Sequence, residues 1–168
     1  MPRTQEEFEE FAVARTPQLY RAAWLMCGDA HRAEDLVQET LAKVYVRWHR
    51  RLGGPIEHPV AYAHTTLTRT YISAQRRRSN QETPVDDLPE GVEQGGDATT
   101  TLALRGALAQ LAPLDRAVLV MRFLEDVSVA DTADALGVSP GAVRNRTLRA
   151  LDRLRAVLGP SLRDLLEI

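Results

Sequence analysis

Residues 128–151 read SVADTADALGVSPGAVRNRTLRAL and contain two short helical patterns separated by a tight turn. Ser128 and Ser139 are suited to cap the helices that follow them, and Pro140 fits a first helical turn. Gly137, at the turn, can adopt the left-handed backbone conformation that other residues disfavour. Two helices joined by a turn of about three residues that contains glycine are typical of a helix-turn-helix.

The second helix of this pair has two different faces. Its predicted inner face consists of Val143, Thr147, Ala150, Leu151, Leu154 and Val157. Its predicted outer face consists of Arg144, Asn145, Leu148 and Arg149, with Arg146 on the flank and Ser139 at the N-terminal cap. Arginine can donate two hydrogen bonds to guanine, and asparagine can form two with adenine. We therefore predict that this outer face reads the major groove of DNA; the alternative is a solvated helix whose arginines fill exposed positions.

The pattern upstream of this motif is also helical. The clearest amphipathic stripe follows Gly28-Asp29 and contains Ala33, Leu36, Val37, Thr40, Leu41, Val44 and Trp48. These residues recur at intervals of three and four, as the buried face of a helix requires. Thr16-Pro17 predicts an interruption of the preceding helix, since threonine can cap and proline suits a first turn. Pro59 predicts the start of a third helix, and Pro113 the start of a later one with Leu124 on its inner face.

The segment between the two helical sets differs from both in composition. Residues 79–101 contain six acidic residues and no basic residue, and glycines and prolines are frequent. We interpret residues 80–98 as a linker between two all-α domains, at 4–79 and 99–160. The alternative is a long surface loop within one domain. No alternating strand pattern is present, so the predicted fold class is all-α.

The composition limits the function. The 168 residues carry a net charge of −2, which argues against indiscriminate nucleic-acid binding. No apolar run approaches the roughly 18–20 residues that a membrane span needs, and no signal peptide is apparent. The single cysteine excludes an internal disulfide, and the four histidines never lie four residues apart on one helix. We expect a cytoplasmic protein without membrane insertion, metal, cofactor or catalytic group.

A second polar face is predicted on the helix that begins at Pro59. Its members lie off the apolar stripe of Val60, Ala63, Leu67 and Tyr71, and the helix ends in Arg76-Arg77-Arg78. The face contains Tyr62, His64, Thr65, Thr66, Arg69, Thr70 and Ser73. An aromatic ring, short hydroxyls and a basic end suit single-stranded nucleic acid. On composition alone, a plain polar helix face is the better interpretation.

Nearly the whole chain resembles the extracytoplasmic-function (group IV) sigma-70 family of bacterial RNA polymerase sigma factors. The resemblance rests on Gly28-Asp29, on AEDLVQET at 33–40, YVRW at 45–48, PVAY at 59–62 and RTYIS at 69–73, and on LAPLDRAVL at 111–119 with the helix-turn-helix. The composition is similar to that of actinobacterial members. Many relatives carry Asn where this chain has Arg69, which affects the expected −10 preference.

The resemblance implies two domains, sigma region 2 and sigma region 4, and assigns roles to their residues. Asp35, Gln38 and Glu39 match the groups that bind the coiled coil of the polymerase beta-prime clamp. The loop 51–58 and the following helix would open and hold the −10 element, through Tyr62, Thr66, Arg69, Thr70, Ser73, Arg76 and Arg77. The last helix would read the −35 element, through Ser139, Arg144, Asn145, Arg146, Leu148 and Arg149. The helix at 114–124 would face the beta flap.

The resemblance further implies a monomer that binds core RNA polymerase and promoter DNA, and it allows an anti-sigma factor as a partner. Two alternatives are a stand-alone helix-turn-helix regulator that binds duplex DNA as a dimer, and a helical enzyme with an appended DNA-binding domain. The regulator would need a dimerisation helix, and the tail at 161–168 is too short for a coiled coil. The enzyme would need a catalytic cluster, and the sequence contains no recognisable one.

Overall fold

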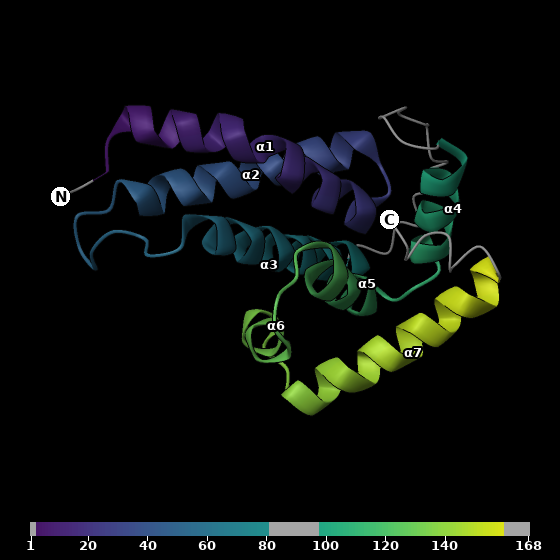
Figure 1. The fold of residues 1–168 in the computed structure, drawn as a ribbon. Coiled ribbons are helices and arrows are strands. Elements are labelled where there is room, and N and C mark those ends of the chain that lie inside the picture. The colour runs from purple at the N-terminus through teal and green to yellow at the C-terminus, as the bar shows by residue number, and fades with distance from the viewer. Residues whose placement is uncertain (1–2, 81–97, 160–168) are drawn as a thin grey trace. The chain divides into compact units, whose positions relative to one another are not determined.

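The computed structural model describes residues 3–80 and 98–159, and the side chains of 3–80 and 102–159. The chain divides into two compact units, Met1–Pro84 and Val85–Ile168. All regular elements in the described part of the chain are helices, as predicted (Figure 1). The predicted acidic linker lies almost entirely outside the described residues, and so does the tail at 161–168.

Unit 1, residues 1–84, contains three helices that pack against one another: α1 (Gln5–Cys27), α2 (Ala30–Trp48) and α3 (Pro59–Asn80) (Figure 1). Its core draws on all three helices. The buried apolar residues include Leu19, Ala22 and Met26 of α1, Ala33, Leu36 and Val44 of α2, and Ala63, Leu67 and Tyr71 of α3. The stripe predicted for α2 is therefore the core face of that helix.

The turn between α1 and α2 spans only two residues. Gly28 adopts a left-handed conformation with φ 70°, and its N–H donates to the Trp24 carbonyl at 2.8 Å. The Asp29 carboxylate then accepts a hydrogen bond from the Arg32 N–H at 2.9 Å and caps α2. Glycine after one helix and aspartate before the next are the residues that these two helix ends favour.

The interruption predicted at Thr16-Pro17 is wrong, because α1 continues through both residues. The Thr16 hydroxyl donates to the Ala12 carbonyl at 2.6 Å, so it bonds backward within the helix and does not cap a new one. Pro17 has no N–H to donate to the Val13 carbonyl. Val13 lies on the outer face of α1 with 77% of its surface exposed, so water can reach that region of the backbone.

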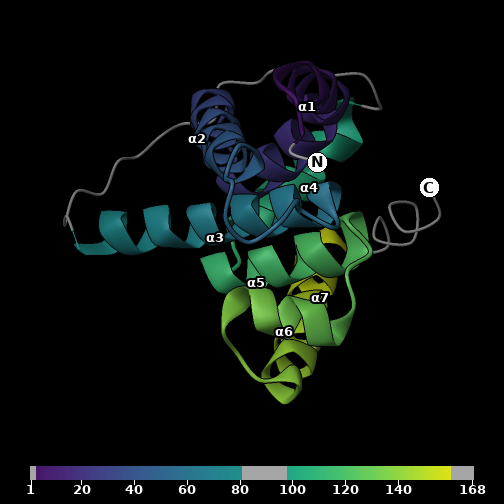
Figure 2. The same cartoon turned by 90° about the vertical axis from the view of Figure 1, so that its left-hand side faces the viewer.

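Unit 2, residues 85–168, contains α4 (Ala98–Ala109), α5 (Pro113–Leu119), a π-helical turn η1 (Val120–Leu124), α6 (Val129–Leu136) and α7 (Pro140–Leu158). The last helix packs against α4, α5 and α6, and Figure 2 shows α5, α6 and α7 from a second side. Val118, Ala133 and Val143 form a buried cluster, surrounded by Val129, Leu136 and Val138.

The predicted helix-turn-helix is present. The Ser128 hydroxyl accepts from the Asp131 N–H at 3.0 Å, and the Ser139 hydroxyl accepts from the Ala142 N–H at 3.0 Å. Gly137 has φ 67°, as the left-handed turn requires. Val138 and Val143 pack in the angle between α6 and α7, as part of the cluster around Ala133.

The inward position predicted for Leu124 is wrong, because this side chain is exposed. The helix that begins at Pro113 widens into η1, where the Glu125 N–H donates to the Val120 carbonyl at 3.1 Å, five residues back. A π turn accommodates an extra residue and shifts the later side chains around the helix axis. Phe123 and Leu124 are therefore both exposed at the end of this element.

Candidate functional site

The outer face of α7 is exposed and basic. Arg144, Asn145, Leu148 and Arg149 are all exposed, while Val143, Ala150 and Leu154 on the opposite face are buried. Leu148 has 63% of its surface exposed, so it does not pack into the described part of unit 2. No acidic residue occurs between positions 140 and 151. The structure thus brings together, on one face, the four residues that sequence analysis predicted for base contact.

Arg146 differs from its neighbours on α7. Its Nη1 atom lies 2.7 Å from Oδ1 of Asp115 on α5, in an ion pair whose side chains are 29% and 18% exposed. This ion pair engages one nitrogen of the guanidinium within unit 2, and the expected −35 contact of Arg146 stays a prediction. The sequence places the two residues 31 positions apart and contains no signal that pairs them.

Ser139 is exposed, and its hydroxyl caps α7 by accepting the Ala142 N–H. Its observed role is to hold the start of this helix. The hydroxyl fixes the first turn, from which the exposed face of Arg144 and Asn145 begins.

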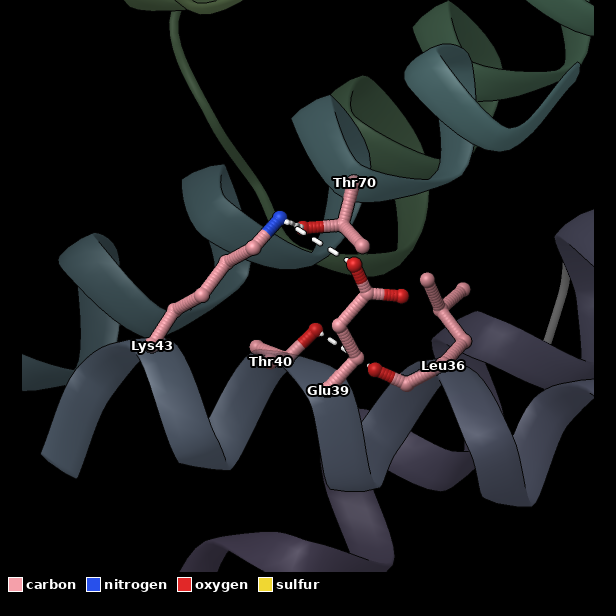
Figure 3. A network of polar contacts seen from close by, with 5 residues as sticks. All are labelled: Leu36, Glu39, Thr40, Lys43 and Thr70. Carbon is pink, nitrogen blue, oxygen red and sulfur yellow. Dashed lines mark hydrogen bonds and ion pairs between the residues drawn. The ribbon is translucent and has the colours of Figure 1, made fainter. Parts of the chain in front are cut away.

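The polar face predicted on α2 is also present. Asp35, Gln38 and Glu39 are exposed, and Leu36, Val37 and Thr40 on the opposite face are buried. Residues three and four apart are neighbours on a helix surface, so the three exposed side chains form one continuous patch. The Thr40 hydroxyl donates to the Leu36 carbonyl at 2.7 Å and does not reach this patch (Figure 3).

Lys43 links this patch to α3. Its Nζ atom lies 3.4 Å from Oε1 of Glu39 and donates to Oγ1 of Thr70 at 3.0 Å (Figure 3). Sequence analysis did not single out Lys43. The only local signal was its position four residues after Glu39, which favours an ion pair on a helix.

Thr70 is the one predicted −10 residue that the structure removes from the surface, with 1% of its area exposed. The prediction is wrong because this side of α3 faces α2, where Lys43 bonds the hydroxyl. The other predicted residues lie at intervals of one, three or four along one stripe. Arg69, Ser73, Arg76 and Arg77 are exposed, while Tyr62 and Thr66 are half-buried. The Thr66 hydroxyl donates to the Tyr62 carbonyl at 2.7 Å.

The loop between α2 and α3 projects a large apolar side chain at its tip. Leu52 is 84% exposed, and Arg50 and Arg51 beside it are exposed as well. Gly53 and Gly54 follow with φ 92° and 71°, the left-handed region that glycine adopts without strain. Further along the loop, the side chain of Ile56 is buried.

The described residues contain no cluster that suits a metal ion. Among residues 3–80 and 98–159, no three His, Cys, Asp or Glu side chains lie together as metal ligands would. Burial and the carboxylates of Glu34 and Asp29 raise the pKa of the Tyr20 phenol above its usual value. Within the same ranges, no helix combines the length and apolar character of a membrane span.

Comparisons with known proteins match both units in order. The description Sigma-70 region 2 matches residues 12–81, and Sigma-70, region 4 matches residues 101–154. The RNA polymerase sigma-E factor of Streptomyces coelicolor is 38% identical over 160 residues, which cover 90% of this chain and 86% of that protein. The ECF RNA polymerase sigma factor SigL of Mycobacterium tuberculosis is 32% identical over 150 residues, which cover 83% and 82%.

The chain belongs to the extracytoplasmic-function sigma-70 family. The fold of this sigma factor is similar to that of a solved structure, the sigma factor RpoE of Bartonella quintana in complex with the anti-sigma factor NepR, with a TM-score of 0.71 at 22% identity. That alignment covers 92% of this chain and 98% of the other. The region 2 match thus covers α2, α3 and most of α1, and the region 4 match covers α5, η1, α6 and most of α4 and α7.

Proposed function

We propose that this sigma factor binds core RNA polymerase through region 2 and directs transcription initiation by contacting the −10 and −35 promoter elements. One observation carries the proposal: both sigma regions are matched in order, each in its own compact unit with an exposed polar or basic helix face. We assign region 2 to residues 4–79, the linker to 80–98 and region 4 to 99–160.

The polymerase contacts divide between the two regions. The exposed patch of Asp35, Gln38 and Glu39 on α2 is the proposed contact with the coiled coil of the beta-prime clamp. In region 4, the apolar side chains of Phe123 and Leu124 are exposed to solvent where η1 ends. Exposed apolar side chains at adjacent positions favour a protein partner. We assign them to the beta flap.

The −10 element is assigned to α3 and the loop before it. The stripe of Tyr62, Thr66, Arg69, Ser73 and Arg76 combines an aromatic ring, hydroxyls and cations, which suit the bases and phosphates of an opened strand. Arg77 extends the basic end of the stripe. Thr70 is excluded because it is buried. The exposed tip of loop 51–58 would hold a base taken out of the stack.

The −35 element is assigned to the outer face of α7. Arg144 and Arg149 can each bond guanine, Asn145 can bond adenine, and Leu148 can contact a thymine methyl group. Because these side chains are exposed on one face while the opposite face is buried, they can enter the major groove together. Ser139, which caps α7, and Arg146, which pairs with Asp115 through one nitrogen, complete the proposed −35 contact at the start and flank of this helix.

Four further features belong to the proposal. The named relatives from Streptomyces and Mycobacterium support an actinobacterial type. Action on polymerase places the protein in the cytoplasm, and it works there as a monomeric specificity subunit without catalysis of its own. An anti-sigma factor is a proposed partner, since the structurally similar Bartonella protein binds one.

Run-off transcription tests the proposed function. Purified sigma factor is added to core RNA polymerase on a library of genomic fragments, and the transcripts are sequenced from their 5′ ends. We expect start sites that share two upstream elements and that require both sigma factor and core. A footprint on duplex DNA without core, together with no sigma-dependent transcript, would support the stand-alone regulator and contradict the proposal.

A further inference from the structure

Two arginines from separate elements hold the backbone of the loop between α2 and α3. Arg3 Nη2, in the segment before α1, donates to the Ile56 carbonyl at 2.9 Å. Arg47 Nη1, in the last turn of α2, donates to the Gly54 carbonyl at 3.0 Å. The Arg3 bond joins residues that are 53 positions apart. The C-terminal half of the loop is therefore attached to two other parts of unit 1.

Arg3 is itself fixed by Trp48. Its guanidinium carbon lies 4.7 Å from the centre of the Trp48 ring, within the range of a cation–π contact. The Trp48 indole Nε1 donates to the Thr4 carbonyl at 3.2 Å, which holds the chain beside Arg3 in place. Phe8 and Phe11 of α1 contact the same indole, with ring centroids 5.6 and 5.2 Å away. The guanidinium thus bridges an aromatic cluster and a loop carbonyl.

The attachments leave the loop tip exposed. Leu52, at 84% exposure, lies between the exposed Arg51 and the left-handed Gly53. A cation beside an exposed apolar side chain suits DNA opening, because the cation can bind a phosphate and the apolar group can insert at an unstacked base step. An opened strand would therefore meet this tip while the other half of the loop stays attached at Gly54 and Ile56.

We infer that Arg3 is a positioning residue for promoter opening, which acts by holding loop 51–58 in the geometry that captures the opened −10 strand. The inference rests on the proposed role of this loop. The region 2 match begins at residue 12, so it does not cover Arg3. A loop that is already ordered loses less conformational entropy when it binds, so capture of the strand is faster and tighter.

The experiment measures open-complex formation by full-length holoenzyme at saturating concentration, on a promoter from the transcription screen. A 2-aminopurine base in the −10 element reports strand opening. The same promoter with a mismatched, already open −10 region serves as a second template, on which abortive initiation is measured. The variants are Arg3→Ala and Arg3→Lys, with Arg15→Ala as the matched control. Arg15 is an arginine within α1, and its Nη1 donates to Oε1 of Gln18 on the same helix at 3.1 Å.

We expect Arg3→Ala to open the duplex promoter about tenfold more slowly, a factor equal to about 1.4 kcal/mol in the barrier. On the already open template, it should initiate within about twofold of the natural protein, a difference of about 0.4 kcal/mol. Its affinity for core should not change. Arg3→Lys should resemble Arg3→Ala, because an ammonium lacks the planar fork that stacks and donates at once. Arg15→Ala should open both templates at the normal rate.

A loop variant that carries both Arg51→Ala and Leu52→Ala separates the positioning role of Arg3 from the proposed function of the loop itself. If this variant opens DNA slowly but Arg3→Ala does not, the positioning role of Arg3 is wrong and the loop function stands. If the loop variant opens DNA normally, the proposed loop function is wrong, and the inference on Arg3 fails with it. Equal losses by Arg3→Ala on both templates, with weaker core binding, would indicate general destabilisation of region 2 and would also overturn the inference.

Discussion

Arg146 of α7 and Asp115 of α5 form an ion pair with 2.7 Å between Nη1 and Oδ1, and this pair attaches α7 to the preceding part of unit 2. The two side chains are mostly buried, so solvent screens their attraction less than on an open surface. One flanking cation of α7 thus stabilises the fold, while Arg144 and Arg149 are exposed.

The first prediction concerns this pair. Asp115→Asn and Arg146→Ala should each lower the free energy of unfolding by about 1–2 kcal/mol, because each leaves a partly buried charge without its partner. The double variant should cost little more than either single one, with a coupling energy of about 1 kcal/mol. Denaturation followed by far-UV circular dichroism measures all three.

An internal control is available for this measurement. Both tryptophans, Trp24 and Trp48, lie in region 2, so their fluorescence should report an unchanged transition there. If the stability losses of the two single variants add up in the double variant, the two side chains do not interact, and the ion pair is contradicted. A normal stability of Arg146→Ala, with a salt slope of promoter binding reduced by about one, would show that Arg146 acts mainly as a phosphate contact.

The second prediction concerns base reading by α7. Arg149→Ala should cost about 1–3 kcal/mol at a preferred −35 sequence, and the loss should depend on the base offered, because a bidentate arginine contact distinguishes bases. Promoter competition with reconstituted holoenzyme measures it. Arg155→Ala is the control, since Arg155 lies on the same helix but pairs with Asp152. Equal losses on all −35 sequences would show that Arg149 makes no base contact.

The third prediction concerns polymerase binding. Replacing Asp35 and Gln38 together with alanine should weaken the affinity for core about tenfold or more, which corresponds to about 1.4 kcal/mol. Helicity should not fall, because both side chains are exposed and alanine is a strong helix former. Fluorescence anisotropy of labelled sigma factor measures the affinity. Glu10→Ala, an exposed acidic position on α1, should bind normally; a similar loss there would indicate a non-specific charge effect.

The fourth prediction tests the corrected position of Thr70. Thr70→Val should lower the free energy of unfolding by about 0.5–1.5 kcal/mol, because Lys43 loses its hydrogen bond, and should leave −10 base preference unchanged. Arg69→Ala, on the exposed stripe, should alter that preference. Transcription from a promoter set randomised at the −10 element measures both. A changed preference for Thr70→Val alone would show that Thr70 acts on DNA.

Local patterns predicted the helices well, because their signals lie within a few residues of the structures they specify. As expected, Ser128 and Ser139 cap the helices that follow them, and Gly137 forms the left-handed turn between these helices. Gly28-Asp29 separates α1 from α2, also as expected. The failure at Pro17 has a physical cause: tertiary packing of α1 outweighs the loss of one helical hydrogen bond at an exposed position. Such packing is not visible in the local sequence.

The site residues were predicted less completely, because helical spacing shows which residues share a face but not which element covers it. Thr70 lies at the edge of the exposed stripe and is buried by α2, where Lys43 bonds it. Arg146 bonds Asp115, and Arg3 bonds the Ile56 carbonyl, although these partners are 31 and 53 residues apart in the sequence. The extra residue in η1, which exposes Leu124, also has no simple sequence signal.

The two-residue turn at Gly28-Asp29 has a consequence for biosynthesis. Because α1, α2 and α3 follow one another and pack together, most contacts of unit 1 join nearby parts of the chain. Helical proteins dominated by such contacts fold within microseconds to milliseconds, much faster than about 5–20 residues are added per second during translation. Unit 1 ends at Pro84. We therefore expect unit 1 of the nascent chain to fold on the ribosome before the synthesis of unit 2 is complete.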